Sequence, residues 1–448
     1  MRVLPPILEM AREIRAGETT AARVTAECLA RIEELEPAVS AWVLVDKAGA
    51  TRTAELSSHE ALAGKLRGPL DGIPIAVKDV FDVEGFPTRA GSSLTSPSCA
   101  QRDAAVVARL RAAGAIVLGK TVTTEFACFD PSPTRNPWNL EHTPGGSSSG
   151  SAAAVALGMC FGALASQTGG SITRPAAYCG VAGIKPTFGC LSRSGVVPVS
   201  FHLDHVGVMA RGVADCRLLF DWMLGDDPSD PACVPRPNIE AAGTERDSRP
   251  KLGILRDYFF ETAEPDVASL TEGAIEKLAA AGAEVLSLEQ LPGFDQVHAM
   301  HRRIMAAEAA TYHRETYAAS REKYGPNLTS LLEEGGAISM SDYQSALRAQ
   351  QAFRHAANRA LIQLDALITP ATPGPAPRGL SSTGDPRFNS PWSFAGVPTV
   401  SFPFTLAASG LPLSLQLVGR SWSEHPLLTA AEWCESVLGF HHAPPPAV

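Results

Sequence analysis

Three short segments of this sequence contain residues whose types and spacing suit proton transfer and nucleophilic attack. The first is the apolar run 73–80, which contains Lys78. Burial penalises the charged form of a lysine, so a lysine inside such a run is expected to have a lowered pKa and a neutral amine that accepts a proton. In the alternative interpretation, Lys78 lies at a strand end, where it reaches solvent or pairs with Asp79 or Asp82. Lys78 is therefore a candidate base.

The second segment is the glycine- and serine-rich loop 145–150, which leads into the alanine-rich run 151–158. Hydroxyls and amides that crowd at the start of a helix suit an anion or a proton relay. A flexible linker is a weaker interpretation because a linker would not lead into an apolar helix. A phosphate loop is also disfavoured, since the Gly-Lys-Ser/Thr ending is missing. The loop therefore has the composition of a polar site.

The third segment is the turn Thr168-Gly169-Gly170-Ser171. Consecutive glycines before a serine allow the backbone to turn so that several N–H groups point at one spot, which is the geometry of an oxyanion hole beside a nucleophile. Gly-Gly-Ser also occurs in ordinary turns. This turn alone does not identify a site.

The elements that must position these segments alternate between helix and strand. Apolar residues recur at helical spacing over residues 7–36, with a break at Gly17 and an end at Pro37, which predicts two helices. Short β-branched runs at 73–79 and 115–119 predict strands with a helix between them. Strands that are apolar almost throughout are typical of a parallel or mixed sheet covered on both faces. The predicted fold class is α/β, with a large mixed central β-sheet flanked by helices on both faces.

A single domain is predicted over residues 1–440, because strands are expected on both sides of the polar connection and no segment looks self-sufficient. Its parts are N-terminal helices (1–66), a catalytic core (67–220), an exposed connection (225–250) and a second α/β segment (251–440), followed by a disordered tail (441–448). Further strands are predicted at 251–255, 284–288, 366–369, 398–402 and 413–418, and further helices at 104–113, 267–281, 298–364 and 425–438.

The composition argues against several classes of protein. The 448 residues include 47 acidic and 38 basic ones, for a net charge of −9, and no long basic run, which argues against a nucleic-acid partner. Neither a secretory signal nor an apolar stretch long enough to cross a bilayer is evident, so a cytoplasmic protein without membrane binding is expected. Nine cysteines without a CxxC pair fit neither a disulfide framework nor a zinc site.

Histidine groups are weak candidates for metal binding. His298 and His301, and His202 with Asp204 and His205, have loosely metal-like spacing, but neither group has a convincing further ligand. No metal site is therefore expected.

Taken together, the lysine, the glycine–serine loop and the TGGS turn resemble the amidase-signature family. The resemblance spans nearly the whole chain and is best between residues 70 and 215. Further matching segments are Thr134-Arg-Asn-Pro-Trp-Asn, Thr143-Pro-Gly-Gly-Ser-Ser-Ser-Gly-Ser, Tyr178-Cys-Gly-Val-Ala-Gly-Ile-Lys-Pro-Thr, Leu203-Asp-His-Val-Gly and Leu411-Pro-Leu-Ser-Leu-Gln.

The resemblance implies a cofactor-independent Ser–cis-Ser–Lys triad of Ser171, Ser147 and Lys78. Ser171 would attack a carbonyl, Ser147 would relay its proton, and neutral Lys78 would receive that proton and later return it to the leaving amine. The peptide bond between Gly146 and Ser147 would be cis. The oxyanion hole would consist of the backbone N–H groups of Thr168, Gly169, Gly170 and Ser171. Supporting residues would be Gly146, Ser148, Gln167 and Arg174.

Two positions differ from the commonest family pattern, which has an aspartate before the TGGS turn and an arginine two residues after the nucleophile. Gln167 and Thr173 occupy these positions here, with Arg174 one residue later. Loss of one member of a buried ion pair would leave the other charge buried without a partner, which is strongly destabilising. Replacement of both members by neutral residues costs little stability. We hypothesise that a neutral hydrogen-bond network around Gln167 replaces the pair.

The substrate class stays open at this stage. Aromatic residues that either line an acyl pocket or belong to the core are Phe126, Phe129, Trp138, Tyr178, Trp392 and Phe394. The preferred function is cleavage of the C–N bond of a small-molecule amide, anilide or carbamate (urethane) through an acyl-enzyme, with esterase side activity. The alternatives are a glutaminase-type subunit of a tRNA-dependent amidotransferase, which needs partner subunits, and a non-catalytic binding protein. A homodimer is a further expectation about partners.

Overall fold

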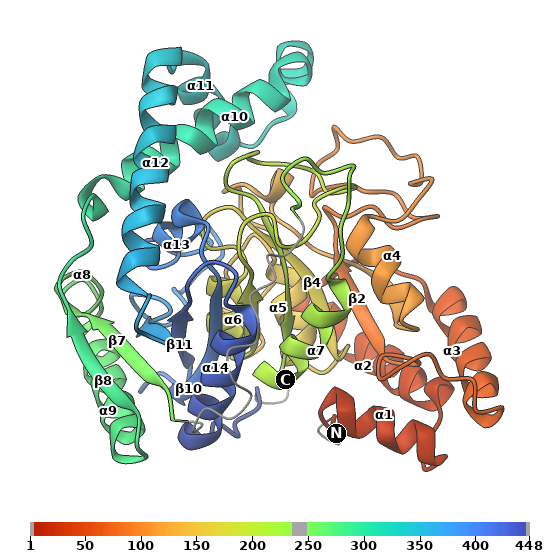
Figure 1. Cartoon of the computed structure of the whole chain (residues 1–448). Coiled ribbons are helices and arrows are strands. Elements are labelled where there is room, and N and C mark those ends of the chain that lie inside the picture. The colour runs from red at the N-terminus through yellow and green to blue at the C-terminus, as the bar shows by residue number, and fades with distance from the viewer. Residues whose placement is uncertain (1–3, 235–248, 445–448) are drawn as a thin grey trace.

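The computed structural model describes residues 4–234 and 249–444, and its strands form one mixed sheet (Figure 1). Within these residues the sheet has 11 strands, in the order β1-β3-β2-β4-β6-β5-β10-β11-β9-β7-β8. The strands are β1 (Trp42–Val45), β2 (Pro74–Lys78), β3 (Ile116–Thr121), β4 (Gly162–Gln167), β5 (Ala182–Lys185), β6 (His205–Ala210), β7 (Lys251–Leu255), β8 (Glu284–Leu288), β9 (Ala366–Pro370), β10 (Thr399–Leu406) and β11 (Pro412–Val418). The predicted α/β class with a mixed sheet is confirmed.

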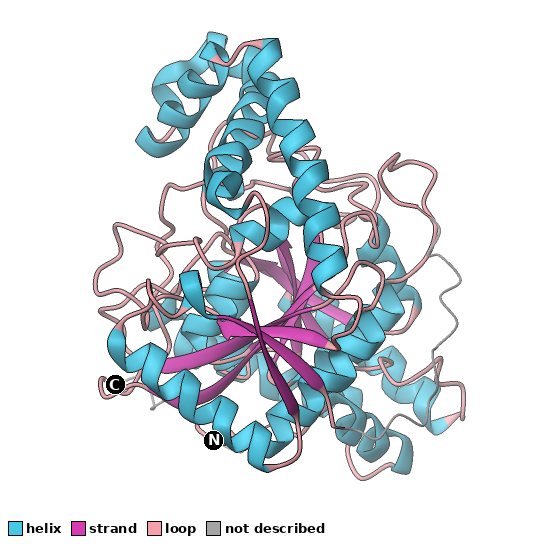
Figure 2. Cartoon of the chain, turned by 60° about the vertical axis from the view of Figure 1, so that its left-hand side comes forward, coloured by secondary structure: helices cyan, strands magenta, loops and turns pink. Residues whose placement is uncertain are grey.

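Helices surround the twisted sheet on both faces, and three of them, α10, α11 and α12, project beyond it (Figures 1 and 2). The helices are α1 (Ile7–Ala16), α2 (Ala21–Val39), α3 (Lys47–Leu62), α4 (Ala105–Ala112), α5 (Ser149–Ala156), α6 (Thr173–Cys179), α7 (Val213–Met223), α8 (Arg256–Phe259), α9 (Pro265–Ala280), α10 (Val297–Ser320), α11 (Pro326–Ala337), α12 (Met340–Ala360), α13 (Ser390–Ala395) and α14 (Glu424–Leu438). Across the described ranges, none of the helices is both long and apolar enough to cross a membrane.

The two N-terminal helices follow local signals in the sequence. Helix α1 ends where Gly17 adopts a left-handed φ of 73°, which glycine tolerates without steric cost. Helix α2 begins after Thr20, whose hydroxyl accepts a hydrogen bond from the backbone N–H of Arg23 at 3.1 Å. The helix continues through Pro37 to Val39, so the predicted end at Pro37 is wrong by two residues. A proline in the last turn costs one hydrogen bond but keeps a helical φ.

Strand β2 places the candidate base at its own carboxyl end, on the edge of the sheet where its parallel neighbours also end. It pairs in parallel with both β3 and β4, and Val77 lies opposite Leu164. Because parallel strands run in the same direction, the carboxyl ends of β2 at Lys78 and of β4 at Gln167 lie at the same edge. The TGGS turn follows β4 directly, so the sheet brings the lysine and the turn together.

Several predicted elements agree with the structure, and others do not. The strands predicted at 251–255 and 284–288 coincide with β7 and β8, whereas the helical region 298–364 is divided into α10, α11 and α12. The sequence did not predict β1, β5, β6, α3 or α7. Both β5 and β6 contain glycine, which weakens the strand signal. Residues 235–248 of the predicted connection and 445–448 of the predicted tail lie outside the described residues.

We expect Gly150→Ala to destabilise the fold, because α5 approaches the backbone of two other segments at this residue. A Cβ atom on Gly150 would lie 2.2 Å from the carbonyl oxygen of Ala41 and 2.5 Å from the backbone nitrogen of Val122. Overpacking of this kind costs about 1–3 kcal/mol, which thermal unfolding of the variant would detect as a lower midpoint.

The matched control is Gly273→Ala in α9, where an added Cβ meets no atom within 4 Å. Replacing a helical glycine by alanine stabilises a helix by about 0.4–1 kcal/mol, so its midpoint should rise or stay unchanged. Equal midpoints for the two variants would contradict the close approach at Gly150.

Candidate active site

Lys78 ends β2 as a fully buried side chain next to two serine hydroxyls. Its Nζ lies 2.7 Å from Ser147 Oγ and 2.9 Å from Ser166 Oγ of β4. Burial lowers the pKa of Lys78 to about 7, and the negative charge of Asp204 opposes that shift. Near neutral pH a large fraction of this amine is therefore unprotonated and can accept a proton.

The two aspartates that could have paired with Lys78 are engaged elsewhere. Asp79 forms a 2.8 Å ion pair with Lys120, which is also buried. Asp82 accepts a 2.8 Å hydrogen bond from the hydroxyl of Thr88. The alternative in which Lys78 reaches solvent or pairs with one of these aspartates therefore does not hold.

The glycine–serine loop presents Ser147 to the lysine. The peptide bond between Gly146 and Ser147 is cis, as predicted. Arg174 donates from Nη2 to the carbonyl oxygen of Gly146 at 2.7 Å, and the Ser148 hydroxyl donates to the carbonyl oxygen of Ser166 at 3.3 Å. These two bonds fix the loop on either side of Ser147, immediately before α5 begins.

Gln167, the last residue of β4, holds the TGGS turn through neutral hydrogen bonds. Its Oε1 accepts from the backbone N–H groups of Ile172 at 2.8 Å and Thr173 at 3.0 Å. Its Nε2 donates to the hydroxyl of Ser393 in α13 at 3.0 Å. Gln167 is only 1 % exposed. The neutral network that we predicted around Gln167 is present.

Two side chains from distant helices bind the carbonyl groups of the turn. His301 of α10 donates from Nε2 to the carbonyl oxygen of Thr168 at 3.0 Å, and Ser393 donates from Oγ to that of Gly169 at 3.0 Å. Burial lowers the pKa of His301 to about 4, so its ring is neutral and Nε2 carries the hydrogen. The Thr168 hydroxyl donates to Asp204 at 2.6 Å. Because the carbonyl groups are fixed, the orientation of the neighbouring N–H groups is fixed as well.

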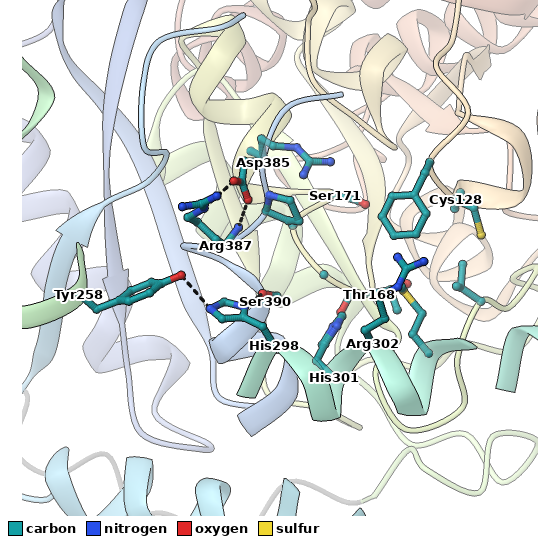
Figure 3. Close-up of a pocket in the computed structure, with 18 residues that line it drawn as sticks. Cys128, Thr168, Ser171, Tyr258, His298, His301, Arg302, Asp385, Arg387 and Ser390 are labelled. Carbon is teal, nitrogen blue, oxygen red and sulfur yellow. Dashed lines mark hydrogen bonds and ion pairs between the residues drawn. The ribbon is translucent and has the colours of Figure 1, made fainter. Parts of the chain in front are cut away.

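A cavity of about 430 Å³ opens beside this turn (Figure 3). Ser171 lines it and is 8 % exposed. One wall carries a row of hydrogen bonds centred on His298. Its Nε2 lies 2.9 Å from the hydroxyl of Tyr258, and its Nδ1 lies 3.1 Å from the hydroxyl of Ser390. The lining residues are Ala127, Cys128, Phe129, Thr168, Gly169, Gly170, Ser171, Arg174, Val199, Tyr258, His298, His301, Arg302, Met305, Asp385, Pro386, Arg387 and Ser390.

Among the aromatic residues considered for an acyl pocket, Phe129 lines this cavity and the others do not. The structure therefore corrects the pocket expectation for Phe126, Trp138, Tyr178, Trp392 and Phe394. Their buried rings pack inside the protein: Phe126 against His313, Trp138 in a cluster with Tyr178, Trp392 against Phe259 and Phe394 against Phe353. Large rings gain more from close packing in the core than from exposure in a cavity, and sequence alone does not separate the two.

The histidines with metal-like spacing have other partners. His298 and His301 make the bonds given above, His202 pairs with Glu308, and His205 Nδ1 lies 2.6 Å from a backbone carbonyl oxygen. In the part of the chain that the structure describes, no group of three or more His, Cys, Asp or Glu side chains could hold a metal ion.

Known proteins resemble this chain over nearly its whole length. A family model described as Amidase matches residues 23–428. One subunit of the glutamyl-tRNA(Gln) amidotransferase of Roseiflexus castenholzii is 37 % identical, over 96 % of this chain and 95 % of its own length. The native peptide amidase of Stenotrophomonas maltophilia superposes with a TM-score of 0.82 at 30 % identity, over 98 % of each chain.

A further solved structure is described as a vestigial protein complex that reveals the evolutionary origins of an s-triazine catabolic enzyme. It superposes with a TM-score of 0.89 at 31 % identity, over 98 % of this chain and all of the other. The family model thus covers most of the chain, and the amidotransferase relative is more than 30 % identical over nearly all of it. The chain belongs to the amidase family, whose enzymes hydrolyse C–N bonds.

We expect Gln167→Glu to impair the site although the two side chains have the same shape. The Ser393 hydroxyl has one proton, which it donates to Gly169, and it accepts from Gln167. A glutamate lacks that N–H donor and would compete with Gly169 for the serine proton. The loss of one buried hydrogen bond costs about 1–3 kcal/mol, so kcat/KM for amide hydrolysis should fall by about tenfold or more.

The control for this substitution is a double-mutant cycle with Ser393→Ala. Because both changes break the same bond to Gly169, the double variant should be no slower than the worse single variant. Strictly additive losses would show that Gln167 acts independently of Ser393.

Proposed function

We propose that this chain is an amidohydrolase that cleaves the C–N bond of an amide, anilide or carbamate through an acyl-enzyme formed on Ser171. The observation that supports it most strongly is the 2.7 Å contact between Lys78 Nζ and Ser147 Oγ in a buried site, with a pKa of about 7 for the lysine. A serine hydroxyl is a weak nucleophile until a base removes its proton. This pair would supply that base next to the cavity that Ser171 lines.

In the first half of the proposed reaction, Ser171 Oγ attacks the carbonyl carbon. Its proton passes to Ser147, whose own proton passes to Lys78 Nζ. The oxygen of the tetrahedral intermediate becomes negative, and the backbone N–H groups of residues 168–171 would stabilise it. Lys78 then returns the proton through Ser147 to the leaving nitrogen, the C–N bond breaks and an amine departs.

In the second half, water replaces the amine. Lys78 accepts a proton from water through Ser147, and the resulting hydroxide attacks the carbonyl carbon of the acyl-enzyme. The proton then returns through Ser147 to Ser171 Oγ as the bond between Oγ and the acyl carbon breaks. His301 and Ser393 take no proton in this scheme. Their bonds to the carbonyl oxygens of Thr168 and Gly169 would keep the oxyanion-binding N–H groups in place before substrate arrives. Activated esters pass through the same kind of intermediate, so esterase side activity is expected.

A second candidate function is the glutaminase-type subunit of a tRNA-dependent amidotransferase. It is favoured by the 37 % identity to the amidotransferase relative described above. We prefer a stand-alone hydrolase, because Gln167 and Thr173 replace the commonest family residues beside Ser171 and the net charge is −9. The chain purified alone should then hydrolyse small amides, whereas glutaminase activity that needs co-purified partners would favour the second candidate.

Lys78→Ala should impair amide cleavage more than ester cleavage. Without Lys78 the poor amine leaving group receives no proton, whereas the phenolate of an activated ester leaves without one. We expect kcat/KM for a 4-nitroanilide to fall by about 10³-fold, and the loss for the matching 4-nitrophenyl ester to be at least about tenfold smaller. Steady-state kinetics on the two substrates gives both numbers.

The control is Lys65→Ala, which removes an exposed lysine and should change neither rate. Equal losses on anilide and ester in Lys78→Ala, or unchanged anilide cleavage, would contradict the role of Lys78 as the proton donor to the amine.

The pH dependence should follow the titration of Lys78. The proposed base is active only when neutral, so kcat/KM for a neutral anilide should fall about tenfold per pH unit below a pH of about 7 and level off above it. His301, with a pKa of about 4, stays neutral over this range. A profile measured between pH 5 and 9 that is flat through neutrality would contradict the base assignment.

A further inference from the structure

Two helices present polar side chains to the site in matching pairs. Helix α10 carries His298 and His301, and helix α13 carries Ser390 and Ser393. Side chains three residues apart lie on the same face of a helix, one turn from each other. His301 and Ser393 bind the carbonyl groups of the TGGS turn. His298 and Ser390 bond each other in the cavity wall, about 5 Å further along each helix axis.

Tyr258 completes this row of three hydrogen-bonding side chains from the other side of His298 (Figure 3). Its ring packs against those of Phe294 and Phe388, with centroids 4.9 Å and 6.0 Å away. Ser390 is 5 % exposed and begins α13. Because packing and the two helices hold all three side chains, the row is oriented before a ligand arrives, which lowers the entropy cost of binding.

The number of protons in the row leaves one hydrogen-bond donor for the cavity. Burial lowers the pKa of His298 and raises that of Tyr258, so near neutral pH the imidazole is neutral and the phenol keeps its proton. The row then has three protons, on the tyrosine hydroxyl, one ring nitrogen and the serine hydroxyl, and its two internal bonds use two of them. The third belongs to Tyr258 or to Ser390, according to which ring nitrogen carries the hydrogen. Among the described residues neither hydroxyl has another hydrogen-bond partner, so a ligand can accept this proton.

The leaving nitrogen and the row lie on different sides of Ser171. In the proposed reaction that nitrogen receives its proton through Ser147, whose carbonyl oxygen accepts from the N–H of Thr124 at 3.2 Å. The segment after Thr124 supplies Cys128 to the cavity wall, and Figure 3 shows Cys128 and the row on opposite sides of Ser171. The amine therefore departs toward Cys128, and the acyl group extends toward the row.

We propose that the row of Tyr258, His298 and Ser390 binds a second carbonyl oxygen in the acyl part of the substrate. The preferred substrates are then amides whose acyl part contains a neutral hydrogen-bond acceptor, rather than amides of plain hydrocarbon acids. A hydrocarbon chain would remove water from the row without supplying an acceptor for its free proton, which is costly. This inference rests on the proposed function, since it concerns the substrate of the same site. It narrows the substrate class that the sequence left open.

The test measures binding rather than turnover, so it does not depend on the proposed chemistry. Two ligands of equal length and branching are compared, N-acetylglycine 4-nitroanilide and 4-methylpentanoic acid 4-nitroanilide. The first has an amide group where the second has only hydrocarbon. Isothermal titration calorimetry is performed on Ser171→Ala and on the row variant, Ser171→Ala/Tyr258→Phe/Ser390→Ala. We expect the ratio of the two dissociation constants to shift against the acetylglycine ligand by at least about fivefold in the row variant, because only that ligand loses a hydrogen bond.

The matched control removes the same two kinds of hydroxyl outside the cavity, in Ser171→Ala/Tyr317→Phe/Ser436→Ala. Tyr317 bonds Glu333, and Ser436 bonds the carbonyl oxygen of Trp433. This variant should keep the ratio of dissociation constants found for Ser171→Ala.

A shift below about fivefold in the row variant, or an equal shift in the control, would overturn the proposal. A purely structural role for the row predicts equal weakening of both ligands, which leaves the ratio unchanged and also overturns it. If the row variant does not fold, Tyr258→Phe and Ser390→Ala are measured separately in the Ser171→Ala protein. One of them must then shift the ratio by the same threshold, since one of the two hydroxyls donates to the ligand.

Failure of this proposal can be distinguished from failure of the proposed function. If the unmodified enzyme hydrolyses the anilides and the ratio of dissociation constants does not depend on the row, the hydrolase assignment stands and the carbonyl-binding row is refuted. If Ser171→Ala retains the anilide hydrolysis of the unmodified enzyme while the ratio depends on the row, the nucleophile assignment fails and the carbonyl-binding row stands.

Discussion

The site depends on one constraint, the burial of Lys78 without an acidic partner. Neighbouring carboxylates are all engaged: Asp79 by Lys120, Asp82 by Thr88, and Asp204 by Thr168 and two backbone N–H groups. An ion pair would hold the proton on the lysine. Because the amine instead meets hydroxyl groups, burial lowers its pKa to about 7, and the fold keeps a proton acceptor in its interior.

The turn next to this base is fixed by neutral groups. Gln167, Ser393 and His301 bind its N–H and carbonyl groups without introducing a charge that would shift the pKa of the lysine. Close packing adds a further constraint, since a Cβ on Gly170 would lie 2.8 Å from Asn389 Oδ1.

Parts of this arrangement could be predicted from the sequence because their signals are local. Strand β2 is an apolar run that contains its own lysine, and Gly-Gly before Ser171 marks a turn with converging amides. The contacts of the turn with His301 and Ser393 could not, since they join residues 133 and 224 positions apart. Their only sequence signals were a loosely metal-like histidine pair and an ordinary serine. Aromatic residues were equally ambiguous, because the same ring suits a pocket wall or a core, and only Phe129 of the six lines the cavity.

The assignment of Ser171 as the nucleophile is tested most directly by intact-protein mass spectrometry after treatment with a fluorophosphonate, which phosphonylates activated serines. One adduct per chain is expected on the unmodified enzyme, and none on Ser171→Ala. Lys78→Ala should be labelled far more slowly, because its serine lacks the base. An adduct that persists in Ser171→Ala, or a chain that is never labelled, would contradict the nucleophile assignment.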